Sequence, residues 1–211
     1  LTTTFQSLRT IAMLPGIRSS KQANRLTHAE DIVRNGRLSR SDYDLAKHLF
    51  GDLVSSVAVS RVYVVHDGFR PEDNEIPLIS FDAPVPQQDS AADPKNHEPD
   101  AADTPEIDTT EEYQELGRQL AYYRKHFPVA PPNTLDSVTP INSSLFRTSD
   151  VRQYASKKHG DLRNVVGFSF SVPIYDQNTR RFKGIVAAVI RANTLEAALI
   201  GLPILPVSAA E

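Results

Sequence analysis

The histidines are the residues of this sequence best suited to metal binding or to proton transfer near neutral pH. Zinc sites commonly use closely spaced pairs, as in His-x-His or His-Glu-x-x-His. Neither spacing occurs among the six histidines, which are His28, His48, His66, His97, His126 and His159. We therefore predict no metal site and interpret the histidines as surface residues.

Nucleophilic catalysis has no sequence signature either. The chain contains no cysteine, which removes thiol nucleophiles, thiolate metal ligands and disulfides together. The stretch Gly167 to Ser171 begins like a Gly-x-Ser-x-Gly turn but lacks the closing glycine, so Ser169 is interpreted as a sheet residue. The glycines are scattered without a phosphate-binding loop, and His66-Asp67 reads as a strand end that enters a turn. The sequence thus predicts a protein that is not an enzyme and uses no cofactor.

The composition is ordinary for a globular fold and unfavourable for nucleic-acid binding. Of 211 residues, 40% are hydrophobic and 23% are charged, with a net charge of -3, whereas nucleic-acid binding depends on clustered Lys and Arg. Residues 84–108 consist of Pro, Asp, Ala, Gln and Glu with scarcely any large apolar residue. Such a segment cannot offset the entropy of ordering. We expect it to be a mobile acidic insertion, dispensable for folding, within a single domain that covers residues 1–211.

Helical periodicity recurs along the chain. Ser41 with Asp44 resembles a capping box before an apolar face. Acidic residues open another strongly amphipathic stretch, which Arg124, Lys125 and His126 close. The expected helices begin at Leu1 and end at Pro15-Gly16, continue weakly up to Asn35-Gly36, and then cover residues 41–54, 111–127 and 195–201.

Alternating apolar residues indicate strands. Residues 57–66 and 76–81, joined through Asp67-Gly68, are expected to form a hairpin. Residues 145–154 and 164–176 follow, and the near-continuous apolar run 182–190 is typical of a central strand. In 164–176, one face is expected to form the centre of the core and the other, with Ser169 and Ser171, to be half-covered, small and polar. The core face comprises Val166, Phe168, Phe170 and Val172.

Together these elements describe an α/β (α+β) fold around one antiparallel sheet. Three segments, in their order and spacing, resemble the Cache (PDC) family of extracellular PAS-like sensor domains. They run from Leu8 to Gly16, from Val62 to Gly68, and from Phe170 to Val189. The resemblance implies a PAS-like antiparallel sheet with a long N-terminal helix and a helical insertion.

The same resemblance implies a place in the cell and a role. Such domains are the periplasmic, extracytoplasmic parts of inner-membrane receptors in bacterial signal transduction, such as sensor histidine kinases of two-component systems or diguanylate cyclases. Membrane attachment would come through flanking helices, and a homodimer is possible. The start Leu-Thr-Thr-Thr is expected to mark a fragment of a longer protein, and the uncharged run 197–210 contains Pro203 and Pro206 and is too short to cross a bilayer.

In the resembling family, a small molecule binds between the sheet and the segment that leads into the later strands. The residues that this implies here are Tyr122, Tyr123, Arg124, Arg147, Asp150, Tyr154 and Tyr175. Ser169 and Ser171, on the small polar face of residues 164–176, are expected to form the floor of the site. Arg offers a planar fork for a carboxylate, and Tyr offers an apolar ring with a hydroxyl. The competing interpretation is structural, with Tyr in the core and Arg neutralising a helix dipole.

The final strand bears on the ligand class. Amino-acid-binding Cache domains carry an Asp there, where this chain has Ala188-Val189-Ile190, so an amino-acid ligand is disfavoured and no other class is indicated. The alternative function is a non-ligand-binding interaction or dimerisation module of a membrane receptor. A cavity beside the sheet would favour ligand binding, and a filled core would favour the alternative.

Overall fold

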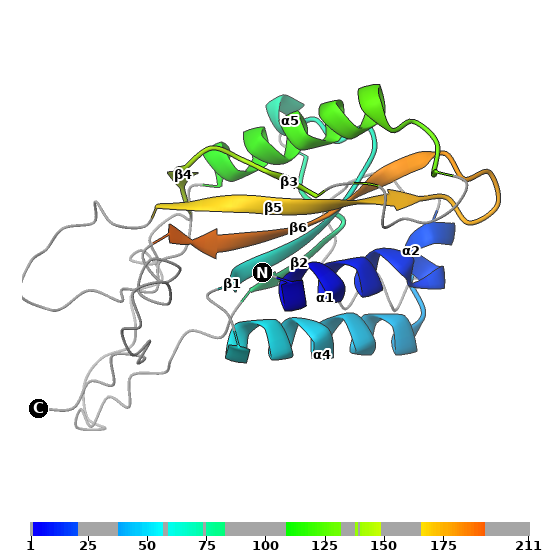
Figure 1. Ribbon diagram of the computed structural model, residues 1–211, viewed down its shortest axis with the longest axis horizontal. Helices are drawn as coiled ribbons and strands as arrows, with labels where there is room; N and C mark the ends of the chain where they lie inside the picture. The colour runs from blue at the N-terminus through cyan, green and yellow to red at the C-terminus, as the bar shows by residue number, and fades with distance from the viewer. Residues whose placement is uncertain are drawn as a thin grey trace, which may run out of the picture.

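The computed structural model describes residues 2–20, 38–56, 59–73, 75–82, 109–131, 138, 140–148 and 166–192. Within them, one antiparallel sheet is covered by helices on both faces (Figure 1). This arrangement confirms the predicted α+β class and is consistent with a PAS-like fold. The acidic insertion, the helix expected at 195–201, Asp150 and Tyr154 lie outside the described residues, as does most of the weak helical stretch before Asn35.

The sheet has the strand order β2-β1-β6-β5-β3, and β4 also pairs with β5. The predicted hairpin is confirmed, because β1 and β2 pair antiparallel. The apolar run is indeed central, since β6 lies between β1 and β5. The strand expected at 145–154 is represented among the described residues by β4 alone. The strands are β1 (Val59–His66), β2 (Ile79–Asp82), β3 (Ile141–Asn142), β4 (Phe146–Arg147), β5 (Val166–Tyr175) and β6 (Phe182–Arg191).

Within the described residues, α1 (Thr2–Met13), α2 (Pro15–Ser19) and α4 (Arg40–Ser56) cover one face of the sheet and α5 (Thr110–His126) covers the other (Figure 1). A 3-10 turn, η1 (Pro71–Asp73), follows β1. The cap of α4 differs from the prediction. Ser39 rather than Ser41 accepts the backbone N–H of Asp42, at 3.0 Å, because the helix begins two residues earlier than the capping-box pattern indicated.

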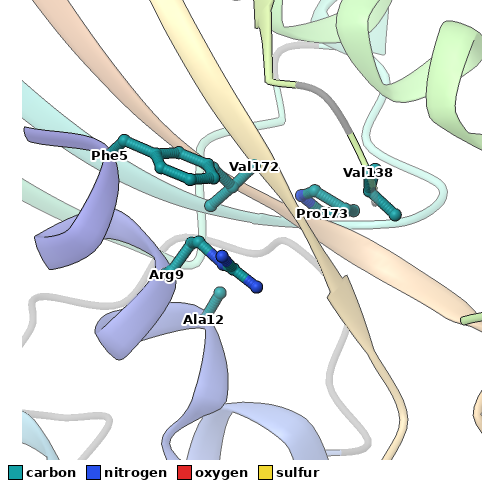
Figure 2. Close-up of a pocket in the computed structure, with 6 residues that line it drawn as sticks. All are labelled: Phe5, Arg9, Ala12, Val138, Val172 and Pro173. Carbon is teal, nitrogen blue, oxygen red and sulfur yellow. The ribbon is translucent and has the colours of Figure 1, made fainter. Parts of the chain in front are cut away.

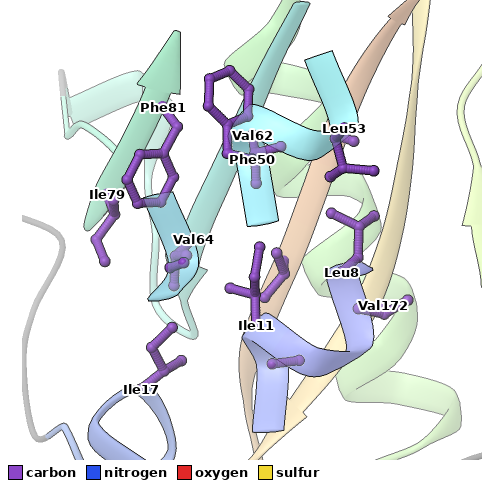
Figure 3. Close-up of a cluster of buried hydrophobic side chains, with 14 of the residues drawn as sticks. Leu8, Ile11, Ile17, Phe50, Leu53, Val62, Val64, Ile79, Phe81 and Val172 are labelled. Carbon is purple, nitrogen blue, oxygen red and sulfur yellow. The ribbon is translucent and has the colours of Figure 1, made fainter. Parts of the chain in front are cut away.

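The larger core lies between α1, α4 and the sheet (Figure 3). Leu8 and Ile11 on α1 meet Val172 of β5 and Val62 of β1, and all four are buried. The predicted alternation of β5 is confirmed, but its centre is displaced. Phe170 and Val172 are buried, whereas Val166 and Phe168 are only half-buried, because they lie near the beginning of β5, at the margin of this core.

The second core fills the space between α5 and the sheet. Leu116 and Leu120 of α5 pack on apolar side chains of β1 and β6. The serine face of β5 is therefore not half-covered, as the sequence suggested. Ser169 is 1% exposed and Ser171 is 0% exposed, because α5 lies directly over them.

Two glycines are required by the backbone where β1 and β6 turn and meet. Gly68 has a φ of 91° in the turn after β1, a conformation that L side chains rarely adopt. At Gly184 an added Cβ would collide with the carbonyl oxygen of Val65. The absence of a side chain thus allows β6 to pair closely with the end of β1.

The topology gives the sheet two distinct ends. At the entry end, β5 begins and β6 finishes, since Gly167 pairs with Arg191. The first half of α1 lies beside the middle of β5, where the Phe5 ring packs edge-on against Phe170 at 6.2 Å. At the opposite end, which we call the hairpin end, β5 turns into β6 through residues 176–181. The helices α1 and α2 therefore run from the middle of the sheet toward the hairpin end, where Arg18 Nε donates to the Tyr175 carbonyl at 3.0 Å, whereas β6 finishes at the entry end (Figure 1).

Candidate functional site

The buried face of α5 is unusually polar for a helix that covers a sheet. Glu112, Glu115 and Gln119 recur at spacings of three and four, in the same face as the apolar residues Leu116 and Leu120, and all are buried. Charged and amide side chains are rarely buried without specific partners. We call the space between α5 and the sheet the polar layer. The hydrogen bonds and ion pairs of its side chains indicate which functions it can serve.

At the entry end, this layer is an ionic cluster. The Tyr63 hydroxyl donates to Glu112 Oε2 at 2.5 Å, and Arg61 Nη1 lies 3.3 Å from the same oxygen. Arg61 also forms an ion pair with Asp82 of β2. Burial alone would lower the pKa of Arg61, but Tyr63, Glu112 and Asp82 outweigh it and raise that pKa. Burial, followed by the Glu112 charge, raises the pKa of Tyr63, so the cluster holds a permanent guanidinium and a neutral phenol.

In the middle of the layer, α5 is tied to β5 through Gln119. Its Nε2 donates to Ser169 Oγ at 2.6 Å. Two further polar atoms here, Gln119 Oε1 and Ser171 Oγ, are buried and make no hydrogen bond of good geometry within the described residues, although the Ser171 side chain lies close enough to Tyr123 to lower the pKa of that phenol against the larger effect of burial. A buried polar group without a partner costs about 1–3 kcal/mol. These two atoms are thus an unsatisfied acceptor and an unsatisfied hydroxyl beneath one helix.

Toward the hairpin end, Tyr123 closes the layer. Its hydroxyl donates to the Ser171 carbonyl at 2.8 Å and accepts the N–H of Ile141 at 3.2 Å. Burial raises the pKa of Tyr123. The phenol therefore stays neutral and joins α5 to both β5 and β3.

Glu115 lies on the flank of α5, one turn before Gln119. Burial raises the pKa of its carboxyl, although Arg118 Nη1 is 3.1 Å away. Next to it, Glu111 Oε2 accepts the backbone N–H of Arg147 at 2.7 Å. The Glu111 contact ties the first turn of α5 to β4, whereas the Glu115–Arg118 contact lies within α5.

The structure brings together three of the residues that the sequence singled out: Tyr123, Ser169 and Ser171. The two arginines lie far apart, because Arg147 is beside the start of α5 and Arg124 is near its end, about 20 Å along the helix. Arg124 is half-exposed and donates from Nε and Nη2 to Asp67 Oδ1 at 2.8 and 2.5 Å. One ligand of metabolite size cannot contact both.

The remaining predicted residues are not part of the group formed by Gln119, Ser169 and Ser171. Tyr122 is exposed and packs its ring 4.5 Å from that of His126. Tyr175 is buried, donates its hydroxyl to the Phe127 carbonyl at 3.3 Å, and has its pKa raised to about 12 by burial. A role for either in ligand binding stays a prediction, as it does for Asp150 and Tyr154.

Sequence reasoning missed the polar residues of the layer itself: Arg61, Tyr63, Glu112, Glu115 and Gln119. A signal was present, since residues 112, 115, 119 and 123 follow helical spacing. The apolar residues that share this face gave the periodicity a simpler explanation, namely core packing.

A small pocket lies on the other side of β5, away from this layer (Figure 2). It is lined by Phe5, Arg9, Ala12, Val138, Val172 and Pro173. Its volume is about 10 Å³, which is room for one water molecule. This pocket is too small for a metabolite and does not coincide with the predicted site.

Two further findings on the described part of the chain concern metal binding and membrane-spanning helices. No group of three or more His, Asp or Glu side chains there is placed to hold a metal ion. No helix within the same residues has the length and hydrophobicity needed to cross a membrane. No family model matches the chain, and neither the curated proteins nor the solved structures contain a significant match.

Proposed function

We propose that this chain is the extracytoplasmic sensing domain of a bacterial membrane signalling protein and binds a small molecule in the polar layer beneath α5. The observation that carries the proposal is the pair of buried, unpartnered atoms Gln119 Oε1 and Ser171 Oγ. Buried polar atoms are nearly always satisfied in folded proteins. Gln119 is 2% exposed and Ser171 is 0% exposed, so α5 has to move away from β5 before a ligand can supply a donor to Gln119 Oε1 and a partner to Ser171 Oγ and remove this cost.

The arrangement of the chain supports the signalling part of the proposal. β5 connects the two layers, because Ser171 faces α5 while Val172 packs in the core that contains α1. A ligand with different affinity for two arrangements of this layer would shift α1 relative to the sheet.

A thermal-shift screen of metabolites tests ligand binding. A compound at about a hundred times its Kd should add roughly 2.7 kcal/mol of stability to the chain that binds it. Gln119→Leu and Ser171→Ala should each reduce that shift. Ser80→Ala, on the exposed side of β2, should leave it unchanged. A response that both layer variants retain in full would place the ligand elsewhere.

One observation favours the second candidate, an interaction or dimerisation module. Met13 on α1 and Leu45 on α4 are 43% and 42% exposed, on helices that pack against each other. Apolar side chains at the surface of a helix pair are suitable for burial against another copy. This function needs no ligand and leaves the layer beneath α5 as a structural feature.

A further inference from the structure

The end of α5 lies beside the β5–β6 hairpin and is fixed to it by backbone hydrogen bonds (Figure 1). The Phe182 N–H donates to Pro128 O and the Ala130 N–H donates to Arg180 O, both at 2.8 Å. Arg180 also donates from Nη2 to Pro131 O at 2.5 Å. These bonds hold the segment that follows α5 directly, so the last turn of the helix cannot leave the sheet without breaking them.

Side chains at the same end strengthen this attachment. The Tyr123 ring stacks on that of Phe182, with 6.2 Å between the ring centroids, and its hydroxyl bonds to both β5 and β3. Arg124 pairs with Asp67 in the turn after β1. The hairpin end of α5 is therefore held by several segments of the sheet at once.

The start of α5 is held to the sheet by its carboxylate side chains. Glu111 Oε2 accepts the Arg147 N–H of β4 at 2.7 Å, and Glu112 Oε2 accepts the Tyr63 hydroxyl of β1 at 2.5 Å. Glu112 also pairs with Arg61 at 3.3 Å. Rotation of these two glutamate side chains would release the first turns of the helix while its last turn stays in place.

The Glu112 contact is arranged so that it can open without leaving an unpaired charge inside the protein. Breaking a buried ion pair is costly chiefly because one charge stays buried alone. Arg61 is shared between Glu112 on α5 and Asp82 on β2, so it keeps a carboxylate when Glu112 leaves. Arg61 Nη1 also stays bonded to the Tyr63 hydroxyl, at 3.0 Å. Glu112, which is 2% exposed while α5 is closed, then becomes hydrated.

We propose that α5 is a lid over the polar layer, which pivots at the hairpin end and opens at the entry end when Glu112 separates from Arg61 and Tyr63. This inference rests on the proposed function, because the open lid is the route by which a ligand reaches Gln119. Opening also exposes Leu116, which is 0% exposed while α5 is closed, so the open arrangement is a minor population. A ligand that binds with higher affinity when α5 is displaced increases that population.

Thiol labelling of the full chain, without any ligand, tests the pivot. The chain contains no cysteine, so a single substituted residue supplies the only thiol. Two buried valines beneath α5 are suitable, since Val189 pairs with Arg61 at the entry end and Val65 lies just before Asp67 at the hairpin end. We expect N-ethylmaleimide to modify Val189→Cys at least about fivefold faster than Val65→Cys, because labelling of a buried group follows the local opening equilibrium.

The role of Glu112 is tested by Glu112→Ala, with Gln114→Ala on the exposed side of α5 as the matched control. Glu112→Ala removes a contact of the closed arrangement only, so it should raise the labelling rate of Val189→Cys by roughly fivefold or more. Gln114→Ala should leave that rate unchanged. Ala188→Cys, at the preceding position on β6, faces the other core and reports unfolding of the whole chain, so Glu112→Ala should raise its labelling far less.

Amide hydrogen exchange of the unaltered chain is a second measurement that needs no thiol. The Arg147 N–H, which bonds to Glu111, should exchange faster than the Ile141 N–H, which bonds to the Tyr123 hydroxyl. Equal labelling at the two valine positions, an equal rise at Ala188→Cys, or faster exchange at Ile141 would overturn the lid. A compound that still bound the polar layer would then leave the proposed function intact, whereas an opening lid for which a broad screen finds no compound would count against that function alone.

Discussion

Gln119 on α5 donates its side-chain amide to the Ser169 hydroxyl on β5 at 2.6 Å, and its own Oε1 is left buried without a partner. Two strand positions further on, Ser171 Oγ is also buried and makes no hydrogen bond of good geometry to any residue that the structure describes. A satisfied serine and an unsatisfied serine thus occupy the same face of one strand, beneath one helix. This contrast permits a direct test of which polar groups hold the fold and which are available to a ligand.

Ser169→Ala should lower the free energy of unfolding, whereas Ser171→Ala should not. Removing the Ser169 hydroxyl takes away the nearest partner of Gln119 Nε2 and should cost about 1–3 kcal/mol. Removing Ser171 Oγ eliminates an unsatisfied group, so the free energy of unfolding should stay within about 0.5 kcal/mol or rise. Denaturant melts of the two variants measure the difference. Equal losses would mean that Ser171 Oγ has a partner in solution, such as a water molecule.

Phe170 should contribute more to stability than Phe168. Phe170 is 7% exposed and packs against Phe5, so Phe170→Ala should cost roughly 3–5 kcal/mol. Phe168 is half-buried at the margin of the same core, and its replacement by Ala should cost clearly less. Denaturant melts of the two variants at matched protein concentration compare them. A larger loss for Phe168→Ala would contradict the described packing of β5.

Gly184→Ala should be among the most damaging small substitutions. The added methyl group would overlap the Val65 carbonyl, which is backbone within the central pair of strands. Gly51→Ala on α4 is a suitable control, since nothing lies within 4 Å of its added Cβ and Ala favours a helix. Thermal unfolding should show a large loss for the first variant and none for the second. A stable Gly184→Ala protein would mean that β1 and β6 do not pair in this register.

Stability should fall as the pH rises above about 10. Burial raises the pKa of Tyr63 and Tyr123, and raises that of Tyr175 to about 12, whereas an unfolded tyrosine titrates near 10. Above that pH the unfolded chain binds fewer protons than the folded one, so the free energy of unfolding decreases with pH. Burial lowers the pKa of Lys183. This one group therefore makes the free energy of unfolding increase with pH, which opposes the effect of the tyrosines only in part.

The thermal midpoint measured between about pH 8 and 11 tests this dependence. Tyr175→Phe removes one of the three phenols and should make the decline shallower, although it loses the weak bond to the Phe127 carbonyl. An alkaline decline that is as steep in Tyr175→Phe as in the unaltered chain would show that Tyr175 is not protected by the fold.

The interaction-module alternative predicts a change in oligomeric state. If α1 and α4 form an interface between copies, Met13→Glu with Leu45→Glu should convert a dimer to a monomer in light scattering. Leu145→Glu, at another exposed apolar residue with 65% exposure, is the control. A chain that is monomeric before any substitution, at all concentrations tested, would remove the support for this alternative.

The sheet and its main helices could be predicted because their signals are local. The alternation in β5, the run of β6 and the periodicity of α5 each follow from burial of one face. The layer beneath α5 could not be predicted, because it depends on which strand lies opposite each helix position. Arg61 and Glu112 are separated by 51 positions, and nothing local in the sequence indicates that they meet.

The same reason explains why residues of the predicted site have other surroundings in the structure than the sequence indicated. Arg124 reads from the sequence as an arginine available to a ligand, but the fold places Asp67 of the β1 turn beside it. Ser169 and Ser171 read as an open polar floor, but α5 covers them. In both cases the missing information was a contact between distant segments rather than a local preference.

Completion of the polar layer beneath α5 by a small molecule is the main function proposed for this chain. Its most direct test is an NMR titration of the isotope-labelled chain with a compound found by thermal shift. We predict saturable shifts of the Gln119 side-chain amide and of the Ser169 and Ser171 backbone amides, with smaller shifts on α1. Shifts confined to the Phe5 and Arg9 pocket or to the hairpin end, with an unchanged Gln119 amide at saturation, would contradict the claim.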